Sequence, residues 1–101
     1  MMVDKIEITA DKMERIAEIL KAISHPVRLQ ILGIMQQHEP LSVAQLMEHT
    51  GIEQSLLSHH LIKMKDKGVL NSTRNGRNIN YSLVDRSILD LFGCMENCNF
   101  I

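Results

Sequence analysis

The chain has 101 residues, of which 45% are hydrophobic and 23% are charged, and its formal net charge is −1. This composition is typical of one small folded domain, here residues 1–101, and excludes a disordered chain. No apolar run approaches the roughly 20 residues that a membrane-spanning helix needs, and residues 1–12 lack the apolar core of a secretory signal. We therefore expect a cytoplasmic protein with no membrane partner.

Charge is distributed unevenly along the chain. Residues 61–84 carry a net charge of +4, whereas residues 1–60 carry −3 and residues 85–101 carry −2. Most basic segments are only a solvated surface, but a basic segment is also what a protein that binds a polyanion needs. Charge alone leaves both alternatives open.

The N-terminal third of the chain predicts two helices. Thr9 can cap a helix over residues 10–23. The apolar stripe of this helix is Met13, Ile16, Leu20 and Ile23. Pro26 suits the first position of a second helix, which we expect to end near residue 37. Its apolar residues are spread nearly all round the axis, which indicates a helix buried on most sides.

A helix-turn-helix pair comes next. Ser42 and Gln45 form an S-x-x-Q capping box for a short third helix, which Gly51 closes. A fourth helix begins after a cap at Glu53 and ends at Gly68. The connection of about four residues between the two helices has the length of a helix-turn-helix joint.

Beyond residue 68 the pattern changes to that of a β-hairpin. The segments VLNSTR and RNINYSLV flank Asn75-Gly76, which is typical of a two-residue type I′ turn with positive φ at both central positions. Asp85 then caps a last helix over residues 85–98. The order of elements predicts an α+β, mainly α fold: a winged helix-turn-helix with four helices, a two-stranded wing and a C-terminal dimerisation helix.

The first and last helices carry apolar stripes that the central core does not obviously need. Exposed stripes of this size usually mark an interface, so we expect a two-fold homodimer built from residues 10–23 and 85–98. The alternative is that both stripes close the core of a monomer.

The fourth helix offers a polar face for binding. Leu57, Leu61 and Met64 are expected to face the core. The remaining face consists of Gln54, Ser55, Ser58, His59 and Lys63. Such side chains in the N-terminal half of a second helix-turn-helix helix contact base edges in the major groove, where Gln can pair with adenine.

The wing adds positive charge beside that helix. Arg74 and Arg77 stand on either side of the expected turn and, with Lys63, are candidates for phosphate contacts. We therefore expect double-stranded DNA as the partner. The alternative is a winged helix that binds a protein through the same surface. No base and nucleophile stand at a catalytic spacing, so an enzyme is not expected.

His59 and His60 are adjacent on the fourth helix, where neighbouring side chains project roughly 100° apart. They therefore cannot chelate one metal ion as an i,i+4 pair does. We expect His59 to be exposed and His60 to lie at the edge of the core, bonded to the backbone or to water.

Several motifs in this order resemble the ArsR/SmtB family of bacterial winged-helix repressors. They are SHPVRLQIL, LSVAQL, QSLLSHHLIKMKDKGVL and a hairpin that ends in YSL, and the resemblance covers about residues 16–85. It implies a homodimer that sits on an imperfect palindromic operator and leaves it when an inducer binds. It also places Gln54, Ser55, Ser58 and His59 on the recognition helix and residues 74–77 on the wing.

The sequence departs from the metal and redox motifs of that family. The third-helix stretch LSVAQLMEHT has no cysteine, and the second helix has none either. A four-ligand pattern near the C-terminus matches Asp85, Ser87, Cys98 and Ile101, which retain only the first acid and a substituted third ligand.

Cys94 and Cys98 remain as candidates for an effector site. At i,i+4 spacing their Cβ atoms would lie roughly 5–6 Å apart, against about 3.5–4.5 Å in a disulfide, so geometry favours a shared soft or divalent metal ion. In a dimer, two chains would offer up to four thiolates or form an interchain disulfide. The alternative is that both cysteines are small hydrophobic residues of the interface.

Overall fold

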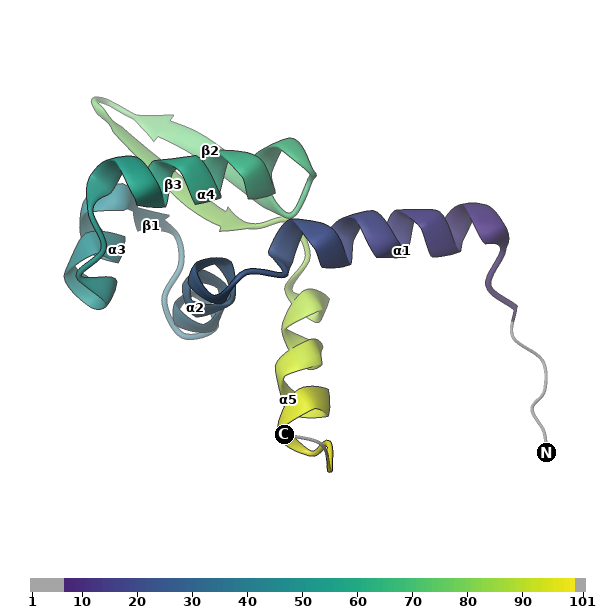
Figure 1. Cartoon of the computed structure of the whole chain (residues 1–101). Helices are drawn as coiled ribbons and strands as arrows, with labels where there is room; N and C mark the ends of the chain where they lie inside the picture. Colours follow the sequence, from purple (N-terminus) through teal and green to yellow (C-terminus); the bar gives the residue numbers. More distant parts are fainter. Residues whose placement is uncertain (1–6, 100–101) are drawn as a thin grey trace.

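The computed structural model describes residues 7–99 and contains the predicted elements in the predicted order. Its helices are α1 (Ala10–Ile23), α2 (Pro26–Met35), α3 (Val43–Thr50), α4 (Gln54–Asp66) and α5 (Asp90–Glu96), with a 3₁₀ turn, η1 (Arg86–Leu89), before the last. Figure 1 shows α2, α3, α4 and the hairpin packed together, while α1 and α5 extend away from them. The predicted winged helix-turn-helix fold is confirmed.

The sheet has three antiparallel strands rather than the predicted two. The hairpin strands β2 (Leu70–Asn75) and β3 (Asn78–Leu83) are joined by a third strand, β1 (Leu41–Ser42), on the other edge of β3. Leu41 lies opposite Tyr81 in this pairing. A strand of two residues is too short to produce an alternating pattern, so it could not be predicted from the sequence.

The hydrophobic core lies between α2, α3, α4 and the sheet. Most of its large side chains have at most 2% of their surface exposed. Among them are Ile31, Leu32, Met35, Leu46, Leu57, Leu61, Met64 and Leu70. The predicted inward face of α4 is therefore confirmed. Each such side chain contributes about 1.5–3 kcal/mol by leaving water, and together they fix the orientation of α4 relative to the hairpin.

The predicted caps are present at α1 and α3, whereas Glu53 precedes α4 without a capping bond from its side chain. The hydroxyl of Thr9 accepts a hydrogen bond from the backbone N–H of Lys12 at 3.2 Å. Ser42 and Gln45 form both bonds of a capping box. Gly51 closes α3 with φ of 72°, a left-handed conformation that favours glycine. These local signals set the helix-turn-helix joint.

The position of the wing turn differs from the prediction. The wing turn is centred on Gly76 and Arg77, because Asn75 still pairs with Asn78 in the ladder. Of these residues only Gly76 has positive φ, at 67°, so the expected type I′ turn at Asn75-Gly76 is wrong. Glycine at the first central position allows a turn that leaves the next residue at negative φ.

The C-terminal helix is shorter than the predicted span of residues 85–98. Asp85 does act as a cap, accepting a hydrogen bond from the backbone N–H of Ser87 at 2.9 Å, but the first turn is 3₁₀ and α5 ends at Glu96. Gly93 and Asn97 disfavour a longer helix. The second helix likewise ends at Met35, two residues earlier than expected.

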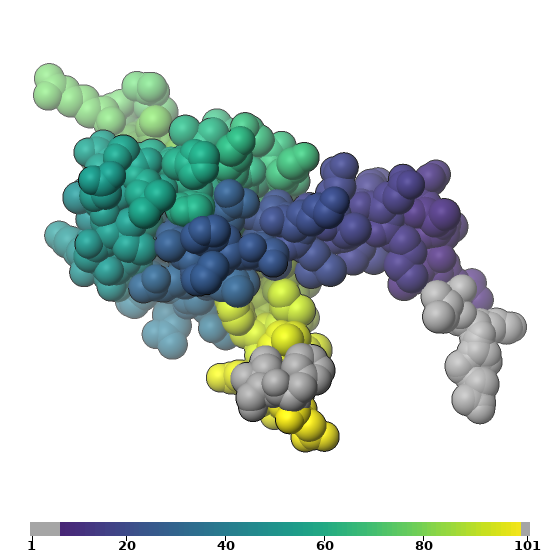
Figure 2. Space-filling model, viewed as in Figure 1, coloured from purple at the N-terminus to yellow at the C-terminus, as the bar shows by residue number. Residues whose placement is uncertain are grey.

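The apolar stripe of α1 faces away from the core along most of its length. Met13, Ile16 and Leu20 have 47%, 41% and 46% of their surface exposed, whereas Ile23 is buried. Figure 2 shows α1 protruding beyond the rest of the molecule. Within residues 7–99 no helix is both long and apolar enough to cross a membrane.

Candidate nucleic-acid interface

A groove of about 380 Å³ separates α4 from the wing. Gln54 and Ser58 line it from successive turns of α4, and Arg77 lines it from the hairpin turn. The polar edge of α4 and the cationic tip of the wing therefore face one space. An amide, a hydroxyl and a guanidinium together can read base edges and neutralise a phosphate.

Arg74 belongs to the same face of the hairpin. It lies opposite Ile79 in the β2–β3 ladder, and side chains of directly opposed residues lie on the same face of a sheet. Ile79 lines the groove beside α4. Arg74 is exposed, so its guanidinium is available to a partner on that side.

The other predicted residues of α4 lie outside this groove. Ser55 and His59 are exposed on its outer edge, where the hydroxyl of Ser55 donates a hydrogen bond to Glu53. Lys63 lies on the opposite flank, in a hollow between α4, α1 and α2. The structure thus brings Gln54, Ser58 and Arg77 together. It places Ser55 and His59 on the outer edge of α4, and Lys63 on the flank beyond that edge.

His60 is the buried histidine of α4, with 4% of its surface exposed. Its Nδ1 accepts a hydrogen bond from Nε of Arg28 at 3.0 Å, a side-chain partner that the sequence did not predict. Nη1 of Arg28 also donates to the carbonyl of Ala22 at 2.9 Å. One side chain therefore links the end of α1 and the start of α2 to the middle of α4.

The surroundings of His60 lower its pKa below the ordinary value of 6.5. Burial is the largest cause, followed by the proximity of His25, Arg28 and His59. The ring of His25 lies 4.3 Å from that of His60, centroid to centroid. Nδ1 of His25 accepts a hydrogen bond from the backbone N–H of Val27 at 3.0 Å, and this bond caps α2. A neutral His60 keeps its Nδ1 free to accept from Arg28.

Sequence reasoning missed the apolar part of the groove. Met47, Ile62 and Ile79 line it with 37%, 49% and 38% of their surfaces exposed. The position of Ile62, four residues after Ser58 and therefore on the same edge of α4, could have indicated that it lines the groove. Apolar side chains at such a place can contact the methyl group of thymine.

The candidate effector residues lie apart from this interface, at the C-terminal end. Cys94 is exposed and Cys98 half-buried, and both are free thiols. Cys98 follows the end of α5, and its Sγ donates to the carbonyl of Cys94 at 3.3 Å. In the described part of the chain no three His, Cys, Asp or Glu side chains are grouped to hold a metal ion. A metal at the two cysteines would need further ligands.

Two helices joined at Gly51, the second beside a β-hairpin with a cationic tip, define a winged helix-turn-helix protein. The family model described as "Bacterial regulatory protein, arsR family" matches residues 25–72. The chain belongs to this family, and it is a transcriptional regulator rather than an enzyme.

Regulators and repressors are similar to this chain over most of its length. The HTH-type transcriptional regulator YgaV of Escherichia coli is 34% identical over 83% of this chain and 85% of its own. The crystal structure of the transcriptional repressor PagR of Bacillus anthracis has a TM-score of 0.77 and 33% identity, covering 86% of this chain and 99% of that one. The antimony-specific repressor AntR has a TM-score of 0.79 and 26% identity, with 91% and 86% covered.

Proposed function

We propose that the chain is a homodimeric repressor that binds a palindromic operator in double-stranded DNA through α4 and the wing. The groove that Gln54, Ser58 and Arg77 share is the observation that carries this proposal. Gln54, Ser55, Ser58 and His59 would meet base edges, while Lys63, Arg74 and Arg77 would bind phosphates. The relatives named as repressors support the same conclusion. Such a protein acts in the cytoplasm, where bacterial DNA lies.

The dimer would form through residues 10–23 and 85–98. Support comes from the exposed stripe of α1 and from an apolar groove of about 490 Å³ between α1, α2 and α5. Leu20, Leu91, Phe92 and Met95 are among its lining residues. Covering these side chains with a second copy would remove apolar surface from water and give the DNA-binding site two-fold symmetry.

Release from the operator would be controlled at Cys94 and Cys98. Two thiols of one chain are too few to surround a soft metal ion, so a metal would be shared between protomers. A thiol-reactive signal that oxidises the same pair is the second candidate. The similarity to AntR, which is named as antimony-specific, supports a soft metal or metalloid as the signal. Substitution of the two cysteines distinguishes the two candidates.

The experiment that tests DNA binding is a gel shift with a duplex enriched from a random pool, at several salt concentrations. Each phosphate contact contributes about 0.9 to the slope of log K against log salt. Because both protomers of the dimer carry the two substitutions, replacing Arg74 and Arg77 by Gln should lower the magnitude of the slope by roughly 3.6 and weaken binding to enriched and scrambled duplexes alike.

A binding surface for a protein partner is the competing function. It predicts no enrichment of any duplex sequence and no steep salt dependence with DNA. A wild-type protein that binds no duplex below micromolar concentration at low salt would refute DNA binding and favour that alternative.

A further inference from the structure

On the side of α4 that faces away from the wing lies a cationic hollow of about 520 Å³, between α4, α1 and the start of α2. Four cationic side chains line it, Lys21, Arg28, Lys63 and Lys67, together with the carboxylates of Glu18 and Asp66. We infer that this hollow binds phosphates of the DNA strand on the far side of the major groove, opposite the strand that the wing contacts. This inference rests on the proposed function and extends its binding surface.

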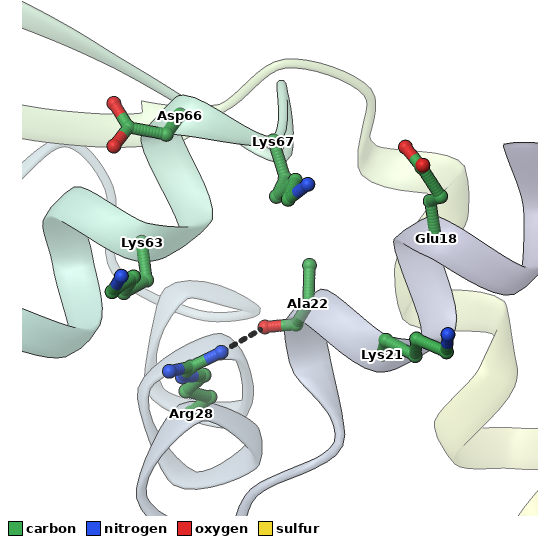
Figure 3. A pocket seen from close by; sticks show the side chains of 7 residues that line it. All are labelled: Glu18, Lys21, Ala22, Arg28, Lys63, Asp66 and Lys67. Carbon is green, nitrogen blue, oxygen red and sulfur yellow. Dashed lines mark hydrogen bonds between the residues drawn. The ribbon is translucent and has the colours of Figure 1, made fainter.

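Among the described residues, the charged side chains of the hollow form no ion pair with one another or with the rest of the chain. Six charged side chains leave a net charge of +2. Among residues 7–99 the one ion pair closer than 4 Å joins Arg86 to Glu39, far from this place. Figure 3 shows the carboxylate of Asp66 directed away from the ammonium group of Lys67. A dianionic or polyanionic partner would complement this arrangement.

Helix geometry places the hollow where a second strand of DNA would run. Ser58 lines the groove between α4 and the wing (the wing groove), and Lys63 lines the hollow. The five positions between these two residues correspond to a rotation of roughly 140° around the helix axis. The exposed ridge of α4, with Ser55 and His59, lies between them. A helix inserted in a major groove about 12 Å wide has one phosphate backbone on each side. The wing would meet one backbone and the hollow the other.

Arg28 makes the hollow a prearranged site. Its guanidinium is held by bonds to the carbonyl of Ala22 and to Nδ1 of His60, as Figure 3 shows for the first of these. Nη2 of Arg28 donates none of these bonds, so it can donate to a phosphate oxygen. Little side-chain entropy would be lost when a phosphate binds to a guanidinium that is already fixed. The same bonds would align α1 with α4 while DNA is bound.

The test compares two double variants of the full chain that remove the same charge from the same two helices. Lys21→Gln with Lys67→Gln removes lysines of the hollow, whereas Lys12→Gln with Lys65→Gln removes one lysine each from α1 and α4 outside it. Arg28 is left in place because it links three helices. Thermal unfolding establishes that both variants are folded.

For the enriched duplex, the hollow variant should lower the magnitude of the salt slope by roughly 3.6, at about 0.9 for each of the two contacts that each protomer loses. The control variant should lower it by less than about a third of that amount. Ethylation interference should lose its signals at phosphates of one strand in each half-site, and only in the hollow variant. Equal slopes for the two variants, or an unchanged interference pattern, would overturn the inference.

Inorganic phosphate distinguishes a small-anion site from a DNA contact. Titration of millimolar phosphate without DNA is followed by NMR at the Nε–H of Arg28. Shifts of this resonance, combined with an unchanged salt slope for DNA in the hollow variant, would show a site for free anions and refute the DNA contact. If the wild-type chain binds no duplex preferentially, the proposed function is refuted. If the wild type does bind the enriched duplex but the hollow variant behaves like the control variant, only the inference about the hollow is refuted.

Discussion

Nε of Arg28 donates a hydrogen bond to the buried Nδ1 of His60 at 3.0 Å, and the same guanidinium bonds the last turn of α1. The bond requires that Nδ1 carry no proton, because a protonated Nδ1 has no lone pair with which to accept it. The arrangement of α1, α2 and α4 is therefore linked to the protonation state of one side chain in the middle of α4.

The free energy of unfolding should fall as pH is lowered from 7 to 5. The pKa of His60 is lower in the folded protein than its ordinary value of 6.5, chiefly because of burial, so the unfolded chain binds the proton first. Stability is then complete above about pH 6.5 and is lost as pH falls toward the folded-state pKa. Urea titrations at a series of pH values measure this dependence.

Two substitutions of His60 separate its charge from its hydrogen bond. In His60→Asn the amide oxygen takes the place of Nδ1 and still accepts from Arg28, so the pH dependence should flatten between pH 5 and 7 while the bond remains. His60→Ala should flatten it too, but should cost about 1–3 kcal/mol at pH 7 because Arg28 loses its acceptor. A His60→Asn variant with the wild-type pH profile would assign the dependence to other groups.

Much of this architecture was predictable because it depends on local signals. Thr9, Ser42, Gln45 and Gly51 mark helix ends through bonds to their own neighbours, and the structure uses all four. The inward face of α4 followed from helical spacing alone. The candidate DNA-contacting residues of α4 were predicted as one polar face, but their division between the wing groove, the outer ridge and the hollow depends on packing against other elements.

The features that the sequence did not predict depend on contacts between distant residues. Arg28 and His60 are 32 positions apart, and nothing near either one indicates their bond. The strand at Leu41 exists because it pairs with β3, across 40 positions of sequence. The turn at Gly76 moved by one residue because the ladder continues to Asn75, and turn residues alone do not fix how far a ladder extends.

Gln54→Ala should reduce discrimination between DNA sequences more than it reduces binding in general. Gln54 lines the wing groove from the first turn of α4, where an amide can pair bidentately with one base. Loss of that pair should cost roughly 1–3 kcal/mol for the enriched duplex and much less for a scrambled one. Gln30→Ala, an exposed position on α2, serves as the control. Equal losses for the two duplexes would remove Gln54 from the reading surface.

Leu20→Glu should dissociate the dimer. The side chain of Leu20 is 46% exposed in the single chain and borders the apolar groove beside α5, so a carboxylate there would be buried without a partner. Sedimentation equilibrium should show weaker association by roughly 2–4 kcal/mol, or about 30- to 1,000-fold. Lys21→Gln changes the net charge equally from the side of α1 that faces α4 and α2 and should leave the dimer intact. A dimeric Leu20→Glu protein would exclude this face of α1 from the interface.

Cys94→Ser and Cys98→Ser should each abolish the response of DNA binding to its signal. The protein has only these two cysteines, so the reduced wild type can be treated with cadmium ion or with the thiol oxidant diamide, and the affinity for the enriched duplex compared with that of each variant. Cadmium is the expected effector if the thiolates of two protomers share a soft metal. A response to diamide accompanied by a covalent dimer on non-reducing electrophoresis would instead show an interchain disulfide, whereas a response without a covalent dimer would indicate a disulfide within one chain. Undiminished responses in the doubly substituted protein would mean that the signal is received elsewhere.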